Sequence, residues 1–282
     1  RELEVEITQE GGKHPVGSVQ RISGDQVVIA TGSRPRVPDA VLESGVPFHN
    51  SDTVMRIDEL PRSMVIVGGG VIAAEFAHVF AALGVQVTVV TRTERMLRVM
   101  DREISQAFTD LARERWHLHT DARPTAVREG GEGVELDLAD GTTITGELLL
   151  VATGRVPNSD GLGLEAAGVR VREDGRVEVD EHGRTSVPGV WSLGDVSSEH
   201  QLKHVANHEA RVVAHNLTHP DDLHSFDHRY VPSAVFTDPQ LAMVGLTEEQ
   251  AREQGYDVTV KIQDYGDVAY GWAMEDTTGL FK

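Results

Sequence analysis

The clearest pattern along the chain is a short apolar run, a glycine turn and an amphipathic stretch in direct succession. Residues 64–67 are wholly apolar, which is typical of a parallel strand buried on both faces. Three glycines follow, residues 71–83 carry apolar side chains at helical spacing, and residues 85–90 form the next apolar run. The pattern predicts a βαβ unit, extended by a helix near 101–115 and a strand at 148–151.

A repeated signal suggests that one domain is inserted in another. The apolar run that ends at Ile29 is followed by Ala30-Thr31-Gly32, and the run at 148–151 is followed by Ala152-Thr153-Gly154. Two strands with the same ending suggest that the chain enters one domain twice, with residues 61–151 inserted between.

The remaining segments carry weaker patterns. Residues 3–7 alternate as a half-buried strand does, and residues 33–60, with three prolines, are expected to form a connector. A strand at 187–193 ends at Gly194-Asp195, and a helix is expected at about 202–217. Residues 231–262 suggest a third unit of strand, turn, helix and strand.

The glycine turn indicates a dinucleotide site. In Gly68-x-Gly70-x-x-Ala73 the first glycine permits the tight turn and the second lets the backbone approach a pyrophosphate. Ala73 allows close packing of helix and strand, and the helix N-terminus offers oriented N–H groups. The alternative is a purely structural turn.

The end of the next strand indicates which dinucleotide is bound. An NAD site needs a carboxylate there to bond the ribose 2′-hydroxyl, but Val90 is followed by Thr91-Arg92, with Arg95 and Arg98 close behind. Guanidinium groups suit a 2′-phosphate, so NADPH is favoured. Two alternatives stay open: the arginines only solvate a loop, or Glu94 acts as a displaced ribose ligand.

Composition excludes several function classes. The net charge of −19 would repel phosphate backbones and anionic membranes, and no apolar run approaches the roughly 20 residues of a membrane span. The amino-terminal residues show no basic-then-apolar export pattern, so we expect a soluble, cytoplasmic protein. The 282 residues contain no cysteine, which excludes disulfides, thiolate metal sites and cysteine nucleophiles within them. The missing initiator methionine and the apolar opening at 279–282 suggest a fragment.

Together these motifs resemble the pyridine nucleotide-disulfide oxidoreductases, the glutathione reductase-like flavoproteins. The resemblance covers essentially the whole chain, and the landmarks occur in the family's order. They are Ala30-Thr31-Gly32-Ser33-x-Pro35, Gly68-x-Gly70-x-x-Ala73-x-Glu75, Ala152-Thr153-Gly154-Arg155-x-Pro157-Asn158, Gly194-Asp195, and Phe236-Thr237-Asp238-Pro239 with Val244-Gly245-Leu246-Thr247. Residues 72–80, 202–211 and 264–276 resemble a branch that reduces a low-molecular-weight disulfide with NADPH.

The resemblance implies an α/β fold of two nested Rossmann-like domains. It places an incomplete FAD-binding domain at 1–36 and 152–229, and an inserted NAD(P)H-binding domain at 61–151. The start of an α+β dimerisation domain follows at 230–282, which implies a homodimer. The redox pair Cys-x-x-x-x-Cys should precede residue 1, and a His–Glu acid–base pair from the partner subunit should follow residue 282.

On the flavin side, the resemblance implies that Asp195 binds the ribityl chain of FAD. The alternative for Asp195 is a helix N-cap. The helix start at Leu202–Ala206 is expected to face the flavin ring, where its dipole would favour negative charge. Thr31, Gly32 and Gly194 complete the expected FAD site.

On the nicotinamide side, Gly68, Gly70 and Ala73 are expected to hold NADPH, with Arg92 and Arg98 on its 2′-phosphate. Glu75 is expected to pair with a lysine upstream of this chain, near the flavin; a solvated surface position is the alternative. Val71 stands where some members have a tyrosine that gates the nicotinamide pocket, so the resemblance does not extend to an aromatic gate. Arg155 is expected close to the cofactor.

Three histidines, His200, His204 and His208, recur at a spacing that would align them on one helix. No convincing set of further ligands accompanies them, so we expect no metal site. The rival functions are a dihydrolipoamide dehydrogenase, a soluble pyridine nucleotide transhydrogenase and an inactive dinucleotide-binding module. The arginine at position 92 argues against an NAD-linked dehydrogenase.

Overall fold

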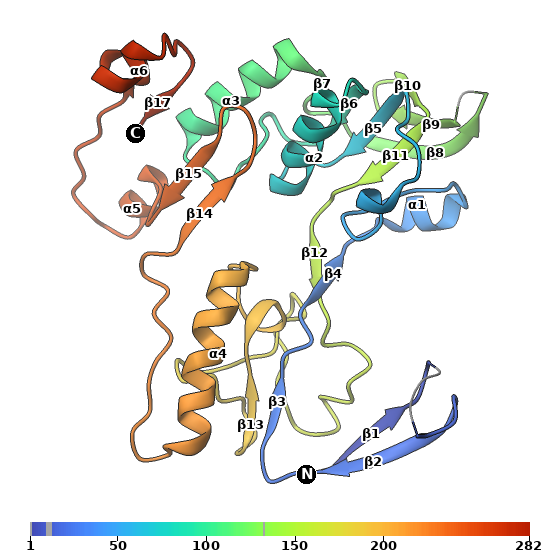
Figure 1. The fold of residues 1–282 in the computed structure, drawn as a ribbon, viewed down its shortest axis with the longest axis vertical. Coiled ribbons are helices and arrows are strands. Elements are labelled where there is room, and N and C mark those ends of the chain that lie inside the picture. The colour runs from blue at the N-terminus through green and yellow to red at the C-terminus, as the bar shows by residue number, and fades with distance from the viewer. Residues whose placement is uncertain (1, 10–12, 132) are drawn as a thin grey trace. The chain divides into compact units, whose positions relative to one another are not determined.

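The computed structural model describes residues 2–9, 13–131 and 133–282, which form two compact units. Unit 1 comprises residues 1–34 and 156–228, and unit 2 comprises residues 35–155 and 229–282 (Figure 1). Among the helices of these described ranges, none has the length and hydropathy needed to cross a bilayer.

A four-stranded parallel sheet forms the centre of unit 2. Its strand order is β11-β5-β6-β7, and all three pairings are parallel. The strands are β5 (Ser63–Val67), β6 (Gln86–Val90), β7 (His117–His119) and β11 (Leu148–Val151). Helix α2 (Val71–Ala82) joins β5 to β6, and α3 (Arg102–Arg115) precedes β7. The predicted βαβ unit and the fold class are confirmed.

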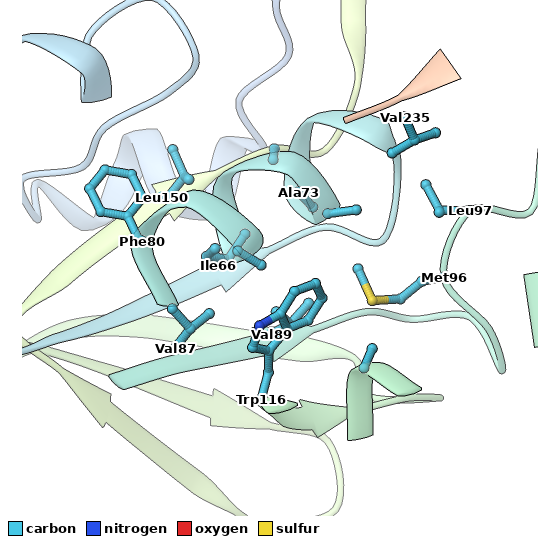
Figure 2. Packing of buried hydrophobic residues seen from close by; sticks show 14 of the residues in the cluster. Ile66, Ala73, Phe80, Val87, Val89, Met96, Leu97, Trp116, Leu150 and Val235 are labelled. Carbon is cyan, nitrogen blue, oxygen red and sulfur yellow. The ribbon is translucent and has the colours of Figure 1, made fainter. Parts of the chain in front are cut away.

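Alternate residues of β5 face opposite sides of this sheet because side chains along a strand alternate in direction. Ile66 lies in the core beneath α2, with Ala73 and Phe80 of that helix (Figure 2). Met64 belongs to the same buried cluster. Val65 and Val67 face the other way. The continuous apolar run of β5 therefore reflects burial on both faces.

The second face of the parallel sheet is covered by an antiparallel sheet. Its strands are β8 (Pro124–Gly130), β9 (Gly133–Leu138) and β10 (Thr143–Gly146). Val127, Leu136 and Ile144 of these strands lie in one cluster with Val65 and Leu149 of the parallel sheet.

The connector predicted at 33–60 contains more structure than expected. It includes β4 (Ser33–Pro35), helix α1 (Asp39–Ser44) and a 3₁₀ turn at Val54–Arg56. Helix α1 has only six residues, too few to show a hydrophobic period. Its boundary signals are nevertheless present, because Pro38 precedes the first turn and Gly45 ends the helix at φ 70°.

The carboxy-terminal part of unit 2 begins with a hairpin of β14 (Pro232–Val235) and β15 (Leu241–Val244), followed by α5 (Glu248–Glu253). The strand predicted to end at residue 262 is wrong. Residues 257–262 alternate in polarity but belong to no strand; β16 (Gln263–Asp264) instead pairs with β17 (Leu280–Phe281), after α6 (Ala269–Ala273).

Asp101 links three parts of unit 2. It caps α3 by accepting from the Glu103 N–H, and its other oxygen accepts from the Glu248 N–H at 3.0 Å. Lys282 Nζ lies 2.7 Å from Asp101 and from Glu248. Partial burial disfavours the charged form, but the hydrogen bonds from Lys282 and the Glu248 N–H lower the pKa of Asp101 from 3.8 to about 2.

The pKa of Asp101 is lower in the folded protein than in the unfolded protein. The ionised carboxylate therefore stabilises the fold above about pH 4, and this contribution is lost as the pH falls towards 2. After allowance for partial exposure, we expect a loss of about 1–2 kcal/mol over this interval. Denaturant unfolding at pH 5 and near pH 2.5 tests this, with Asp101→Asn as the control. Equal pH dependence in the parent and in Asp101→Asn would contradict the assignment.

The described residues of unit 1 include two pairs of strands and one long helix. Strands β1 (Glu2–Glu6) and β2 (Val19–Ser23) form an antiparallel pair, and β3 (Val27–Ile29) pairs in parallel with β13 (Val190–Ser192). Helix α4 (Lys203–Thr218) follows. A small core surrounds Ile29, Val177 and Val196. The strands predicted at 3–7 and 187–193 and the helix at 202–217 are confirmed, with ends shifted by one to three residues. Strand β4 pairs with β12 (Arg155–Pro157).

Candidate functional site

The turn after β5 requires glycine at two positions. Gly68 has φ +144°, and a Cβ atom there would lie 2.2 Å from the Ala152 carbonyl oxygen. At Gly69, a Cβ would lie 2.3 Å from Thr91 Oγ1. The Gly68 N–H donates to Val90 O at 2.9 Å. The turn is therefore held against the carboxyl ends of the two neighbouring strands. The fingerprint Gly68-x-Gly70-x-x-Ala73 accepts any residue at position 69, so the need for glycine there was not predicted.

Gly70 differs from these two glycines because, apart from its chain neighbours, no atom of the described residues lies within 4 Å of where its Cβ would be. It precedes α2, whose first N–H groups have no carbonyl partner within the helix. Ala73, one turn later, is fully buried against the sheet, and Val71 is half-buried. The geometry leaves open space at Gly70 beside a helix N-terminus, which is the arrangement that a pyrophosphate needs.

The arginines after β6 separate into two kinds. Arg92 and Arg98 are exposed, and within the described part of the chain neither has an ion-pair partner. Arg95 is 9% exposed, and its guanidinium contacts Glu94 at 2.7 Å and Ser105 Oγ at 3.3 Å. The Glu94 carboxylate is thus engaged by Arg95, which weakens its case as a ribose ligand.

A backbone hydrogen bond ties the arginine loop to the glycine turn. The Leu97 N–H donates to Gly69 O at 2.7 Å, and the Leu97 side chain is fully buried although its φ is +55°. This bond fixes the residue next to Arg98 at the glycine turn. The positive charges and the open helix N-terminus therefore lie at one edge of the sheet.

The second Ala-Thr-Gly signal also belongs to this edge. The Ala152 N–H donates to Val67 O at 2.8 Å, so the carbonyl that excludes a Cβ at Gly68 is fixed by the sheet. Thr153 Oγ1 donates to Arg36 O at 2.7 Å. Arg155 follows and is half-buried.

The Glu75 side chain is held on α2 by the carboxy-terminal segment. Its Oε1 accepts from the Phe236 N–H at 3.0 Å, and the residue is half-buried. A lysine beside Glu75, as the resemblance implies, stays a prediction. The bond to Phe236 had no sequence signal, because the two residues are 161 positions apart.

Several of the residues predicted to bind FAD lie in unit 1 at or near the 3₁₀ turn Gly194–Val196. Asp195 Oδ2 accepts from Ser33 Oγ at 2.7 Å, and among the described helices Asp195 caps none, since Leu193 and Leu202 stand at the two neighbouring N-cap positions. The Gly194 N–H donates to Glu209 Oε2 at 2.6 Å. Glu209 is 1% exposed and its other oxygen lies 2.9 Å from His228 Nε2. A buried carboxylate therefore fixes the turn that carries Asp195, a role that the sequence did not reveal.

Hydrogen bonds from Asn158 hold the first Ala-Thr-Gly turn, residues 30–32, in place. Asn158 is the last residue of the Gly-Arg-x-Pro-Asn motif. Thr31 Oγ1 donates to Asn158 O at 2.6 Å, and Asn158 Nδ2 donates back to Thr31 O at 2.9 Å. The Asn158 N–H donates to Gly32 O at 2.9 Å. The Thr31 hydroxyl is thus used to shape the turn.

Helix α4 begins beside the Gly194 turn. Leu202 precedes its first residue without a side-chain cap, and the Ala206 methyl group lies 3.5 Å from the position of a Cβ at Gly194. The three histidines at helical spacing do not all lie on this helix, because α4 starts at Lys203 and leaves His200 outside, as the predicted range 202–217 also did. Burial, and then the neighbouring His228, lower the pKa of His200.

Comparison with known proteins identifies the family of the chain. Residues 2–210 match the family described as pyridine nucleotide-disulphide oxidoreductase, and residues 231–282 match its dimerisation domain. The chain is 61% identical to mycothione reductase of Mycobacterium tuberculosis over 267 residues, which cover 93% of this chain and 58% of that protein. It is 34% identical to mercuric reductase of Staphylococcus aureus, over 93% of this chain and 49% of the relative.

Among solved structures, LpdA of Mycobacterium tuberculosis superposes with a TM-score of 0.83 at 29% identity, over 94% of this chain and 57% of that one. The chain thus spans between 49% and 58% of the length of these relatives. A family match over residues 2–210, together with the glycine turn, shows that the chain belongs to the pyridine nucleotide-disulphide oxidoreductases.

Proposed function

We propose that the full-length protein is a cytoplasmic NADPH-dependent reductase of mycothione, the disulfide of mycothiol. The observation that carries the proposal is the pair of exposed arginines, Arg92 and Arg98, on the loop that the Leu97–Gly69 hydrogen bond holds at the glycine turn. Neither arginine has an ion-pair partner among the described residues. The 61% identity to a mycothione reductase, against 34% to a mercuric reductase, supports the choice of substrate.

In this proposal the residues of unit 2 bind NADPH through the backbone of the glycine turn and through the positive charge of the arginines. The Gly70 backbone and the N-terminus of α2 hold the pyrophosphate, and Ala73 permits the close packing that places them. Arg92 and Arg98 bind the 2′-phosphate, and Arg155 lies near the cofactor. Half-buried Val71 borders the nicotinamide pocket without an aromatic gate.

The residues of unit 1 are proposed to hold FAD. Asp195 accepts hydrogen bonds from the ribityl hydroxyls, with its turn fixed by Glu209. Thr31, Gly32 and Gly194 shape the surrounding backbone. Leu202 and Ala206 present the N-terminus of α4, which stabilises negative charge on the flavin ring. FAD, when bound, supplies the chemistry that carries reducing equivalents from NADPH to a disulfide.

The remaining chemistry is proposed for parts of the protein outside residues 1–282. A cysteine pair upstream exchanges with mycothione by thiol–disulfide exchange, and a histidine from the partner subunit moves protons. Glu75 pairs with an upstream lysine beside the flavin. The match of residues 231–282 to a dimerisation domain supports a homodimer. The exposed aromatic side chains of residues 231–282, such as Trp272, are candidates for the subunit interface.

Assay of the full-length enzyme against three disulfides tests the proposal. With NADPH we expect a kcat/KM for mycothione at least roughly 100-fold above those for glutathione disulfide and lipoamide, since differential binding of this size corresponds to about 2.7 kcal/mol. Preference for lipoamide with NAD would instead identify a dihydrolipoamide dehydrogenase. Hydride exchange between NADPH and NAD without any disulfide reduction would identify a transhydrogenase, and a protein purified without flavin would support an inactive module.

A further inference from the structure

A cluster of imidazoles lies at the carboxyl end of α4, apart from the residues assigned to FAD. His215 is on the last turn of the helix, and the chain then reverses through His219-Pro220-Asp221. This reversal brings Asp222 and His224 back to His215. Ligand atoms of these three residues lie within 4.8 Å of one another.

A buried asparagine fixes the backbone that carries the cluster. Asn216 is 1% exposed; its Nδ2 donates to His224 O at 2.9 Å and to His182 O at 3.0 Å. Its Oδ1 accepts from the His224 N–H at 2.8 Å. Both peptide groups of His224 are therefore anchored to α4, so the approach of His224 to His215 is built into the fold.

The side chains are already close to the spacing of metal ligands. His215 Nε2 donates to the Asp222 carbonyl oxygen at 2.8 Å and lies 3.7 Å from Asp222 Oδ2. Two ligands on a tetrahedral ion with bonds near 2.0–2.1 Å are about 3.3 Å apart, so a bound ion would take the place of the hydrogen bond to the carbonyl. The rings of His215 and His224 stack at 3.7 Å. His224 is exposed, so rotation of its side chain can direct a ring nitrogen towards the other two ligands without moving the backbone.

We propose that His215, Asp222 and His224 bind a divalent first-row transition-metal ion, with Zn²⁺ as the reference ion. Two imidazoles and one carboxylate suit such an ion, whereas Ca²⁺ and Mg²⁺ prefer sites made of oxygen ligands. The net charge of −19 adds a general attraction for cations. This site differs from the one considered from sequence spacing, and it uses none of the three histidines near residue 204.

Titration of the chelator-treated, FAD-containing full-length protein with Zn²⁺ tests the site. Calorimetry should show a binding event near neutral pH that His215→Ala and Asp222→Asn each weaken by at least roughly tenfold. Loss of this event in both variants supports the site. Because His215 and Asp222 also contact each other, thermal melting without metal must first show that both variants are folded.

His219→Ala is the matched control. The His219 ring stacks on His215 at 4.3 Å, yet its Nδ1 is engaged by Thr218 and it is not in the ligand set. We expect its Zn²⁺ affinity to stay within about threefold of the parent. Co²⁺ in place of Zn²⁺ should give a visible absorption band that disappears in His215→Ala. Equal Zn²⁺ binding by the parent and His215→Ala would overturn the proposal, as would an absence of binding by the parent.

Discussion

Replacing Arg92 and Arg98 together by alanine will raise the KM for NADPH by at least roughly 100-fold and will change the KM for NADH by no more than about threefold. Each charge-assisted hydrogen bond to a phosphate is worth about 1.5–3 kcal/mol, so the loss of two such groups accounts for the expected factor. NADH lacks the 2′-phosphate and loses nothing specific when the guanidinium groups are removed.

The structure supports this expectation because it shows no other interaction partner for either guanidinium among the described residues. Both are exposed and without ion-pair partners among the described residues, and the Leu97–Gly69 hydrogen bond sets their loop beside the nucleotide turn. Steady-state kinetics of the full-length double variant with both nucleotides is the measurement.

Arg95→Ala is the matched control for the double variant. Its guanidinium is buried against Glu94 and Ser105, so its removal should lower the melting temperature and leave the preference for NADPH over NADH unchanged. If the double variant lost NADPH and NADH equally, the phosphate role would be wrong. If only Arg95→Ala changed the preference for NADPH over NADH, the 2′-phosphate would be bound by Arg95 and not by Arg92 and Arg98.

The second large effect is expected at Asp195. Asp195→Ala in the full-length protein should lose most of its FAD during purification, because the carboxylate is the charged group proposed to accept from the ribityl hydroxyls. Removing a hydrogen-bonded charge of this kind costs about 1.5–3 kcal/mol, which is roughly a 10- to 100-fold loss in FAD affinity. The ratio of flavin to protein absorbance after gel filtration reports the loss.

Asp160→Ala provides the comparison within unit 1. Asp160 is an exposed carboxylate whose partner is Arg34, at 2.7 Å, and the resemblance assigns it no role at the flavin. This variant should keep its flavin. Full retention by Asp195→Ala would remove Asp195 from the FAD site, and flavin loss by both variants would point to general destabilisation of unit 1.

The parts of the fold that were predictable from sequence are those whose signal is local. The strand at Met64–Val67, the glycine turn and the helix from Val71 each carry their own pattern of polarity, and all three are confirmed. The alternating stretch 257–262 shows the limit of such patterns. It has the polarity of a strand but pairs with no strand in the described part of the chain, because pairing depends on residues far away in the sequence.

The candidate sites were predictable in outline for the same reason. The residues that fit a fingerprint could be predicted from the sequence, whereas the contacts that hold these residues in place could not. Glu209 on the Gly194 turn, Asn158 on Thr31 and Ala152 against Gly68 join positions that are distant in sequence. The cluster of His215 and His224 depends on an asparagine that fixes a loop, which no spacing rule contains.

The central claim is that a glycine turn backed by two guanidinium groups binds a 2′-phosphorylated adenosine. Calorimetric titration of the full-length protein with 2′,5′-ADP and with 5′-AMP tests it most directly, because the two ligands differ only at the 2′-phosphate. The account predicts that 2′,5′-ADP binds at least roughly 100-fold more tightly, a difference of about 2.7 kcal/mol. Equal affinity for the two nucleotides would contradict it.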